Sequence, residues 1–250
     1  MPLPSRTVSH FANSVNPTGG PGNVVETNIF GDLPQPDPTR FHTYFEDFDY
    51  YTAADWTVTT TAAITATQGV VTGDGGILQL RFSTTNDDSI IALQKVGNNF
   101  LMESGKSTFF RARLATNSLS ADWVIGLQIT DTTPQNVSDG MYFVKTSGAS
   151  TVDFVVRRNA TTGTTSAAAF TTVSADSFVT LSFYYDGVST VWYGAYDQVV
   201  GSLNVDASLP DAVLTPSFAI ISGGDATVSA PALSVDYLMA MKERTAVSER

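Results

Sequence analysis

Residues 178–203 read FVTLSFYYDGVSTVWYGAYDQVVGSL, with apolar side chains at every second position on either side of an Asp-Gly pair. An alternation with a period of two is typical of a β-strand that buries one face. We therefore expect Val179, Leu181, Phe183 and Tyr185 to point inward. An Asp-Gly pair between two such runs predicts a hairpin, because tight hairpin turns require the positive φ that these residues tolerate. The stretch thus predicts two antiparallel strands joined at Asp186-Gly187.

The same alternation recurs along the chain from Phe45 onward, between clusters of Gly, Asn, Asp, Ser and Thr. It is clear in STFFRARL (107–114), ADWVIGLQITD (121–131), TVDFVVRR (151–158) and LSVDYLMAMKER (233–244). We expect Val152, Phe154 and Val156 to point inward. One face of 107–114 carries Phe110, Ala112 and Leu114, and one face of the last segment carries Leu233, Val235, Tyr237, Met239 and Met241. We expect roughly twelve to fourteen strands and no amphipathic helix. Many antiparallel strands at this spacing predict an all-β sandwich or jelly roll.

The first forty residues have a different composition. Seven of the eleven prolines lie within the first 38 residues, together with NPTGGPGN at 16–23. Proline removes backbone donors and glycine adds conformational freedom, so neither a helix nor a sheet strand is expected there. We divide the chain into an extended N-terminal arm (1–43), a β-sandwich (44–244) and a short C-terminal tail (245–250).

Ordering such an arm costs about 1–2 kcal/mol per residue in backbone entropy. Burial of its few apolar side chains does not offset this cost, so an ordered arm needs its backbone groups paired against either its own domain or a neighbouring subunit. We expect the contacts with that partner to come from Phe11, Val24, Val25, Ile29, Phe30 and Leu33.

The composition excludes several classes of partner. The net charge is −11 and only four of the 250 residues are lysine, so we expect no binding to nucleic acid or to an anionic membrane surface. Cysteine is absent, which removes disulfides and thiolate chemistry. The first residues lack an apolar run behind a basic stretch, so we expect no secretory signal.

The order of these segments resembles the concanavalin A-like (laminin-G/lectin-type) jelly roll. The chain opens with YFEDFDYY (44–51) and TGDGGILQLRFS (72–83), continues through 109–129 and 139–158, and closes with 178–203, TPSFAIISGG (215–224) and LSVDYLMA (233–240). The resemblance covers residues 44–242. It implies a concanavalin A-like jelly-roll sandwich of antiparallel sheets behind the N-terminal arm, but no particular activity.

The fold, the Pro-rich arm, the Thr, Ser and Ala usage and the absence of Cys are also similar to virion proteins of tailed bacteriophages. In that class, jelly-roll domains with arms serve as capsid decoration (cement) proteins. This resemblance implies a structural virion protein that is made in the host cytoplasm and stabilises the outer surface of a phage head. Its partners would be the major capsid protein and neighbouring copies of itself, as a homotrimer. The alternative is a glycan-binding, lectin-like module of a phage tail fibre or spike.

Because this fold includes glycosidases, the acidic segment FEDFDYY was compared with their requirements. A retaining glycosidase needs two carboxyl groups about 5–5.5 Å apart, which the family takes from a Glu-x-Asp-x-(x)-Glu strand. Strand alternation would place Asp47 and Asp49 on one face and Glu46 with Phe48 on the other, and no second Glu follows. Glu103 lies in a different segment.

Histidine usage also argues against catalysis. The fold's alginate-lyase members use a Gln-x-His strand and a basic/Glu strand, and here FFRARL supplies Arg111 and Arg113 without a histidine. Both histidines, His10 and His42, lie in the arm or at its junction. We therefore expect a folded domain without His or Cys, the commonest bases and nucleophiles, and we expect that the chain is not an enzyme.

Two loops carry side chains that could bind Ca²⁺. They are TTNDDS, with Asn86, Asp87 and Asp88, and DTTPQNVSDG, with Asp131, Asn136 and Asp139. We interpret these as turn residues that hydrogen-bond their own backbone, and we predict no metal and no cofactor.

The candidate glycan-binding residues are Trp192, Tyr196 and Phe143, because aromatic rings on an outer face could stack on sugars. In a two-sheet sandwich one face of each strand is core, so core packing is the simpler interpretation of each ring.

Overall fold

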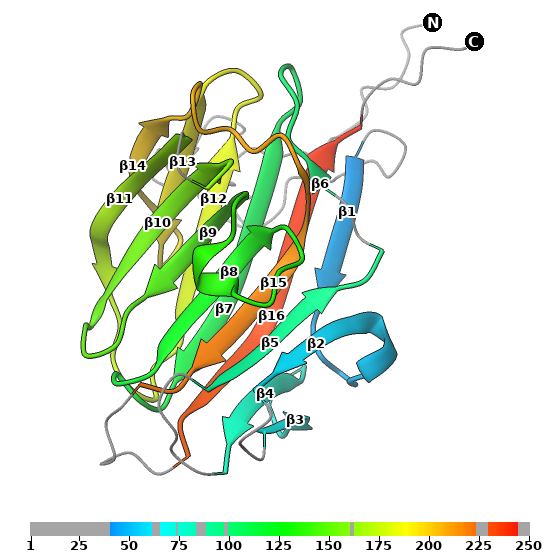
Figure 1. The fold of residues 1–250 in the computed structure, drawn as a ribbon, viewed down its shortest axis with the longest axis vertical. Helices are drawn as coiled ribbons and strands as arrows, with labels where there is room; N and C mark the ends of the chain where they lie inside the picture. The colour runs from blue at the N-terminus through cyan, green and yellow to red at the C-terminus, as the bar shows by residue number, and fades with distance from the viewer. Residues whose placement is uncertain are drawn as a thin grey trace, which may run out of the picture.

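The computed structural model describes residues 41–61, 66–73, 75–83, 89–97, 100–160, 163–223 and 230–244. These residues form sixteen strands, two 3-10 turns (η2, Ala53–Asp55, and η3, Pro134–Asn136) and no α-helix (Figure 1). The strand number exceeds the expected twelve to fourteen because short segments such as β6 (Phe100–Leu101) also pair. In this part of the chain, no helix is long and apolar enough to cross a membrane. The all-β sandwich predicted from the sequence is confirmed.

The first sheet, called here the β7 sheet, has the strand order β14-β13-β12-β7-β16-β4-β3, and β1 also pairs with β16. Every pairing in it is antiparallel. Its strands are β1 (Phe41–Glu46), β3 (Ala66–Val71), β4 (Ile77–Phe82), β7 (Thr108–Thr116), β12 (Val179–Tyr185), β13 (Thr190–Ala195), β14 (Gln198–Asn204) and β16 (Ala232–Glu243).

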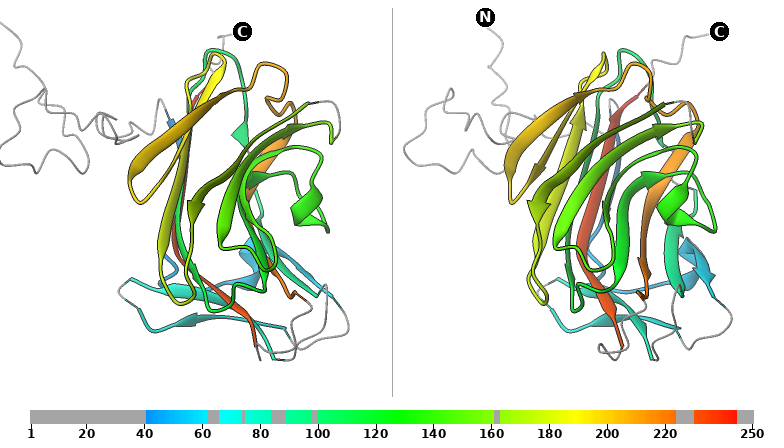
Figure 2. Two further views of the ribbon diagram at one scale, coloured as in Figure 1. Left: turned by 90° about the vertical axis from the view of Figure 1, so that its left-hand side faces the viewer. Right: turned by 60° about the vertical axis from the view of Figure 1, so that its left-hand side comes forward.

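The second sheet, the β8 sheet, has the order β11-β10-β9-β8-β15-β5-β2, and β6 also pairs with β15. Its strands are β2 (Trp56–Thr60), β5 (Ile90–Lys95), β6, β8 (Asp122–Gln128), β9 (Gly140–Lys145), β10 (Thr151–Arg158), β11 (Gly163–Thr172) and β15 (Val213–Ile221). The left panel of Figure 2 shows the two sheets stacked face to face.

The core lies between the sheets and follows the predicted alternation. Phe110 of β7 and Phe183 of β12 stack with ring centroids 5.3 Å apart, and Phe154 of β10 approaches Phe183 from the other sheet at 5.4 Å. All three rings are fully buried. Burying an aromatic side chain of this size contributes a few kcal/mol each, so this interior carries much of the stability.

The hairpin predicted at Asp186-Gly187 joins β12 to β13. The Asp186 carboxylate accepts hydrogen bonds from the backbone N–H groups of Val188, Ser189 and Thr190 at 2.7–3.1 Å. Gly187 has a φ of +80°, and a Cβ there would lie 2.8 Å from the backbone of Lys106. The turn therefore requires glycine both for its dihedral angle and for this close approach.

The first strand begins earlier and ends earlier than expected. β1 starts at Phe41 and ends at Glu46, because its six residues pair with β16 from Leu238 to Glu243. Phe48 has a φ of +51° and turns its buried ring toward Trp56 and Phe218. The expected strand faces of residues 46–49 are therefore wrong, since the strand does not reach them.

The expectation that the folded domain lacks histidine is also wrong. His42 is a β1 residue, and its ring lies 4.7 Å from that of Phe100 in the opposite sheet. Burial lowers the pKa of His42, and the cations Arg244 and Lys242 add to the shift. The domain was expected to begin at residue 44, whereas the first strand already begins at Phe41, so the prediction assigned His42 to the arm.

One buried lysine donates hydrogen bonds to several backbone carbonyls at one end of the β8 sheet. Lys145 is inaccessible to solvent, and its ammonium group donates to the carbonyls of Leu119, Ala121 (2.7 Å) and Thr146 (3.2 Å). Burial lowers the pKa of Lys145 to about 8, while the nearby Asp122 opposes the shift. Removing the donor would leave carbonyl groups without partners in a site that water does not reach.

We therefore expect Lys145→Met to lower the free energy of unfolding by about 2–4 kcal/mol, because it keeps the aliphatic stem but removes the hydrogen bonds. Urea unfolding followed by circular dichroism measures this loss. Arg158→Ala is the control: it breaks an ion pair with Asp211 in which both side chains are over 40% exposed, and should cost less than about 1 kcal/mol. Equal losses for the two variants would contradict the assignment.

The same variant tests the lowered pKa. Between pH 8 and 10.5 the unfolded chain binds more protons at Lys145 than the folded chain does, so the folded state gains stability as the pH rises through this range. The difference in unfolding free energy between the unaltered protein and Lys145→Met should therefore widen from pH 8 to 10.5. A difference that narrows over this range would show that folding favours the charged amine instead.

Candidate functional site

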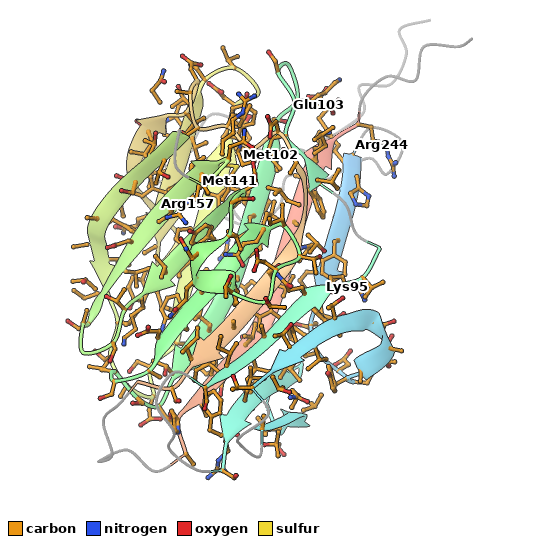
Figure 3. The ribbon with its side chains drawn as sticks, in the orientation of Figure 1. Lys95, Met102, Glu103, Met141, Arg157 and Arg244 are labelled. Carbon is orange, nitrogen blue, oxygen red and sulfur yellow. The ribbon has the colours of Figure 1, made fainter. Side chains whose placement is uncertain are left out.

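The sandwich has two outer faces, and a loop covers one of them. Residues 129–139, including η3, lie on the side of the β8 sheet that faces away from the β7 sheet (Figure 2, left). Val137 of this loop is fully buried and packs with Tyr142 and Ala219. Arg157, labelled in Figure 3, donates to Asn136 Oδ1 at 2.8 Å and to the Val137 carbonyl at 3.2 Å. The outer face of the β7 sheet is therefore the better candidate for a binding surface.

The strand register arranges the side chains of this face in rows across the strands. One row joins Trp192 (β13), Tyr184 (β12), Phe109 (β7) and Met241 (β16), each directly opposite the next. The rings of Tyr184 and Trp192 are stacked, with centroids 5.9 Å apart at an angle of 27°. Trp192 and Tyr184 are partly exposed, whereas Phe109 and Met241 are buried beneath their neighbours. We call this row of three aromatic residues and Met241 the aromatic band.

The next row contains a charged residue among small ones. Arg111 of β7 lies opposite Ser182 of β12, and Ser182 lies opposite Gly194 of β13. The Arg111 guanidinium forms an ion pair with Asp197, in the turn that follows β13. Asp197 lies beyond β12, so the ion pair bridges over Ser182 of β12, where a larger side chain would stand in its path. This crossing explains why Ser182 is only 2% exposed.

The turn itself is shaped to direct Asp197 toward Arg111. Tyr196 and Asp197 both have positive φ, +52° and +65°, which is the conformation of a tight hairpin turn. The backbone N–H of Tyr196 donates to the Thr180 carbonyl at 2.9 Å. The Tyr196 hydroxyl donates to the carbonyl of Thr172, at the end of β11, at 3.3 Å, so this side chain leans toward the other sheet.

A β-bulge in β16 completes the site. The register shifts between Val235 and Tyr237, which places Asp236 and Tyr237 beside β7. Arg111 Nε donates to the Tyr237 hydroxyl at 3.1 Å, and Arg113 forms an ion pair with Asp236. The bulge also corrects the face predicted for this segment. The five residues were expected on one face, but Leu233 and Val235 point inward whereas Tyr237, Met239 and Met241 point outward, because the extra residue inverts the alternation beyond it.

The three candidate glycan-binding residues therefore lie in different environments. Trp192 lies on the outer face of the β7 sheet within the aromatic band, whereas Tyr196 is 52% exposed but lies in the turn and leans away from that band. Phe143 is fully buried between Phe154, Phe170 and Phe183, so its candidacy is wrong. The alternation of β9 places Phe143 on the inner face. The predicted arm residues all lie outside the described residues.

The loops considered for metal binding differ in the same way. Asn86, Asp87 and Asp88 lie outside the described residues. The Asp131 carboxylate accepts the N–H and hydroxyl of Thr133, both at 2.7 Å, and the Asp139 carboxylate accepts the Ser138 hydroxyl at 2.8 Å. Within the described ranges, no three His, Asp or Glu side chains come together as metal ligands would.

The carboxylates considered for catalysis have local partners. Glu46 accepts hydrogen bonds from the Tyr44 hydroxyl at 3.2 Å and from the Phe48 N–H at 3.3 Å. Burial raises the pKa of Tyr44, and the Glu46 carboxylate raises it further. Glu103, labelled in Figure 3, forms an ion pair with Lys242. Neither carboxylate belongs to the rows of the outer face described above.

Comparisons with known proteins identify the fold. The chain matches no protein-family model, and no curated protein matches it. Among solved structures it is similar to an endo-1,3-β-glucanase from Streptomyces sioyaensis, with a TM-score of 0.59 and 14% identity over 85% of this chain and 100% of that one. An endo-β-1,4-glucuronan lyase from Trichoderma reesei has a TM-score of 0.54 and 11% identity, over 81% and 95%. The Emp46p carbohydrate recognition domain has a TM-score of 0.50 and 7% identity, over 78% and 94%.

These comparisons overturn the expectation that the chain is not an enzyme. The fold is shared with proteins named as a glucanase and a lyase, so the fold gives no ground for that expectation. The missing Cys and the scarce His were a poor criterion, since carboxyl groups, and in some families a tyrosine, are sufficient to cleave glycosides. At these identities the likeness shows the fold alone. The chain has a concanavalin A-like jelly-roll fold.

The different positions of Phe143 and Trp192 can be tested by stability measurements. Phe143→Ala removes a fully buried ring and should cost about 3–5 kcal/mol of unfolding free energy. Trp192→Ala removes a partly exposed ring with one stacked neighbour and should cost less than about 1.5 kcal/mol. Urea unfolding followed by far-ultraviolet circular dichroism compares both variants without relying on tryptophan fluorescence. A larger loss for Trp192→Ala would mean that the core and the outer face have been exchanged.

Proposed function

We propose that this protein binds a glycan on the outer face of the β7 sheet. The observation that carries the proposal is the aromatic band, whose stacked Tyr184 and Trp192 rings remain partly exposed. Flat aromatic rings offer large apolar area at low entropic cost, and binding sites combine such rings with a few fixed polar groups. Arg111 and Tyr237 provide polar groups in the adjoining rows, held in place by each other.

The structural neighbours support a role in carbohydrate binding or turnover. They include proteins named as a carbohydrate recognition domain, a glucanase and a glucuronan lyase. This support is an analogy at the level of the fold, because one fold can carry many functions. The local argument from the outer face is therefore the stronger one.

The capsid-decoration hypothesis remains a prediction from the sequence. Its contact residues in the arm lie outside the described residues. The structural neighbours reported above are named as a glucanase, a glucuronan lyase and a carbohydrate recognition domain. The phage partners, the homotrimer and the location on a virion are likewise predictions from the sequence. Co-sedimentation of the full chain with undecorated capsids would test all of them together.

We expect Trp192→Ala to weaken glycan binding at least about tenfold, because it removes one of the two partly exposed stacked rings. A glycan array of β-glucans, uronate polymers and animal-type glycans selects the ligand, and titration calorimetry of the full chain measures the affinity. Tyr50→Ala is the matched control: Tyr50 is a 72% exposed aromatic in the loop after β1, outside the aromatic band.

Two outcomes would contradict the proposal. One is binding that Trp192→Ala leaves intact, and the other is an equal loss in Tyr50→Ala. The same mixtures should be assayed for new reducing ends and for unsaturated sugar products, which report whether a bound chain is hydrolysed or cleaved by elimination.

A further inference from the structure

Two arginines project from β7 onto the outer face, and their environments differ. Arg113 is paired with Asp236, whose side chain is only 9% exposed, and its guanidinium lies 4.2 Å from the Phe178 ring centroid. Arg111 is paired with Asp197, whose side chain is 54% exposed on the β13–β14 turn. The partner of Arg113 is therefore shielded from solvent, whereas the partner of Arg111 is exposed to water.

The Arg111 side chain is held in a fixed orientation next to the aromatic band. Its Nε donates to the Tyr237 hydroxyl at 3.1 Å, and its far end reaches Asp197 across Ser182. Phe109, two residues earlier on the same strand, belongs to the neighbouring row, which is the aromatic band. A glycan lying on Trp192 and Tyr184 would thus have the guanidinium of Arg111 along one side.

Resting on the glycan-binding function proposed above, we propose that the ligand is an acidic glycan whose uronic acid carboxylate binds to Arg111. The Asp197 carboxylate marks the position of this interaction, since it occupies the guanidinium in the absence of ligand. A planar guanidinium matches a carboxylate in geometry, and both charge and hydrogen bonds then discriminate a uronic acid from the neutral sugar.

The charge of the whole chain strengthens the requirement for a local cation. With a net charge of −11, the protein repels an anionic polymer at long range, so such a ligand binds only where a fixed positive group lies next to the stacking surface. The side chain of Arg111 is 23% exposed and that of Asp197 is 54% exposed, so this partly exposed pair makes a modest contribution to stability and a ligand carboxylate replaces Asp197 at modest cost. Asp197 then competes with the ligand, which gives the two partners of one ion pair opposite effects on affinity.

The test compares two oligosaccharides of equal length and linkage, a β-1,4-linked glucuronic acid oligomer and the corresponding β-1,4-linked glucose oligomer. Titration calorimetry with the full chain should show preference for the acidic oligomer. Arg111→Gln should reduce the affinity for the acidic oligomer at least about tenfold more than it reduces the affinity for the neutral oligomer. Asp197→Asn should raise the affinity for the acidic oligomer severalfold. Arg158→Gln, which breaks the exposed pair with Asp211, is the matched control and should change neither affinity.

The outcomes separate this inference from the glycan-binding proposal. If Arg111→Gln weakens both oligomers equally, or if Asp197→Asn weakens the acidic one, Arg111 only supports the surface and the inference is overturned, while glycan binding stands. If the acidic oligomer depends on Arg111 but not on Trp192, the carboxylate site stands and the aromatic platform does not. A sulfated glucose oligomer that binds as tightly as the uronate would overturn selectivity for carboxylate. Absence of binding by either oligomer overturns the inference.

Discussion

The antiparallel pairing of β7 with β16 is the interaction on which the rest of the β7 sheet depends. β16 lies between β7 on one side and both β4 and β1 on the other, so its register determines how the two halves of the sheet meet. The bulge after Val235 adds one residue to this strand. Because the side chains of a strand alternate with a period of two, one extra residue exchanges the faces of everything beyond it. Leu238 and Ala240 thereby enter the core, and Tyr237 and Met239 face outward.

This exchange of faces creates the candidate surface. Without the bulge, Tyr237 would point into a core that Phe110 and Phe183 already fill, and Arg111 would lose its hydroxyl partner. With it, the outer face carries the aromatic band beside an arginine that reaches Asp197 across Ser182. The small side chain of Ser182 leaves room for this ion pair. On the opposite side of the sandwich, the loop containing Val137 packs on the outer face of the β8 sheet, so the two outer faces differ in what covers them.

The fold does not by itself specify a chemical activity. It is shared with proteins named as hydrolases, a lyase and a carbohydrate recognition domain at identities of 7–14%, so function has to be argued from the side chains of each face. An inventory of histidine and cysteine was insufficient for that purpose, because sugar chemistry depends on carboxylates, hydroxyls and stacking rings. Those groups are common in any β-sandwich, and only their spatial arrangement distinguishes a site from a solvated surface.

The sequence by itself determined the fold class, the grouping of β7 side chains onto two faces, the inward faces of β10 and β12, and the Asp186-Gly187 hairpin, because period-two alternation and turn chemistry are local properties. It could not determine which aromatic rings are core, since Phe143 and Trp192 have the same alternating surroundings. They differ in the face on which they lie, because Phe143 packs between the two sheets and Trp192 lies on the outer face of its sheet. The bulge at Asp236, the inclusion of His42 in β1 and the pairing of Arg111 with Asp197 were likewise decided by tertiary structure. Each depends on which strand lies alongside, and strand neighbours far apart in the chain leave no trace in a local pattern.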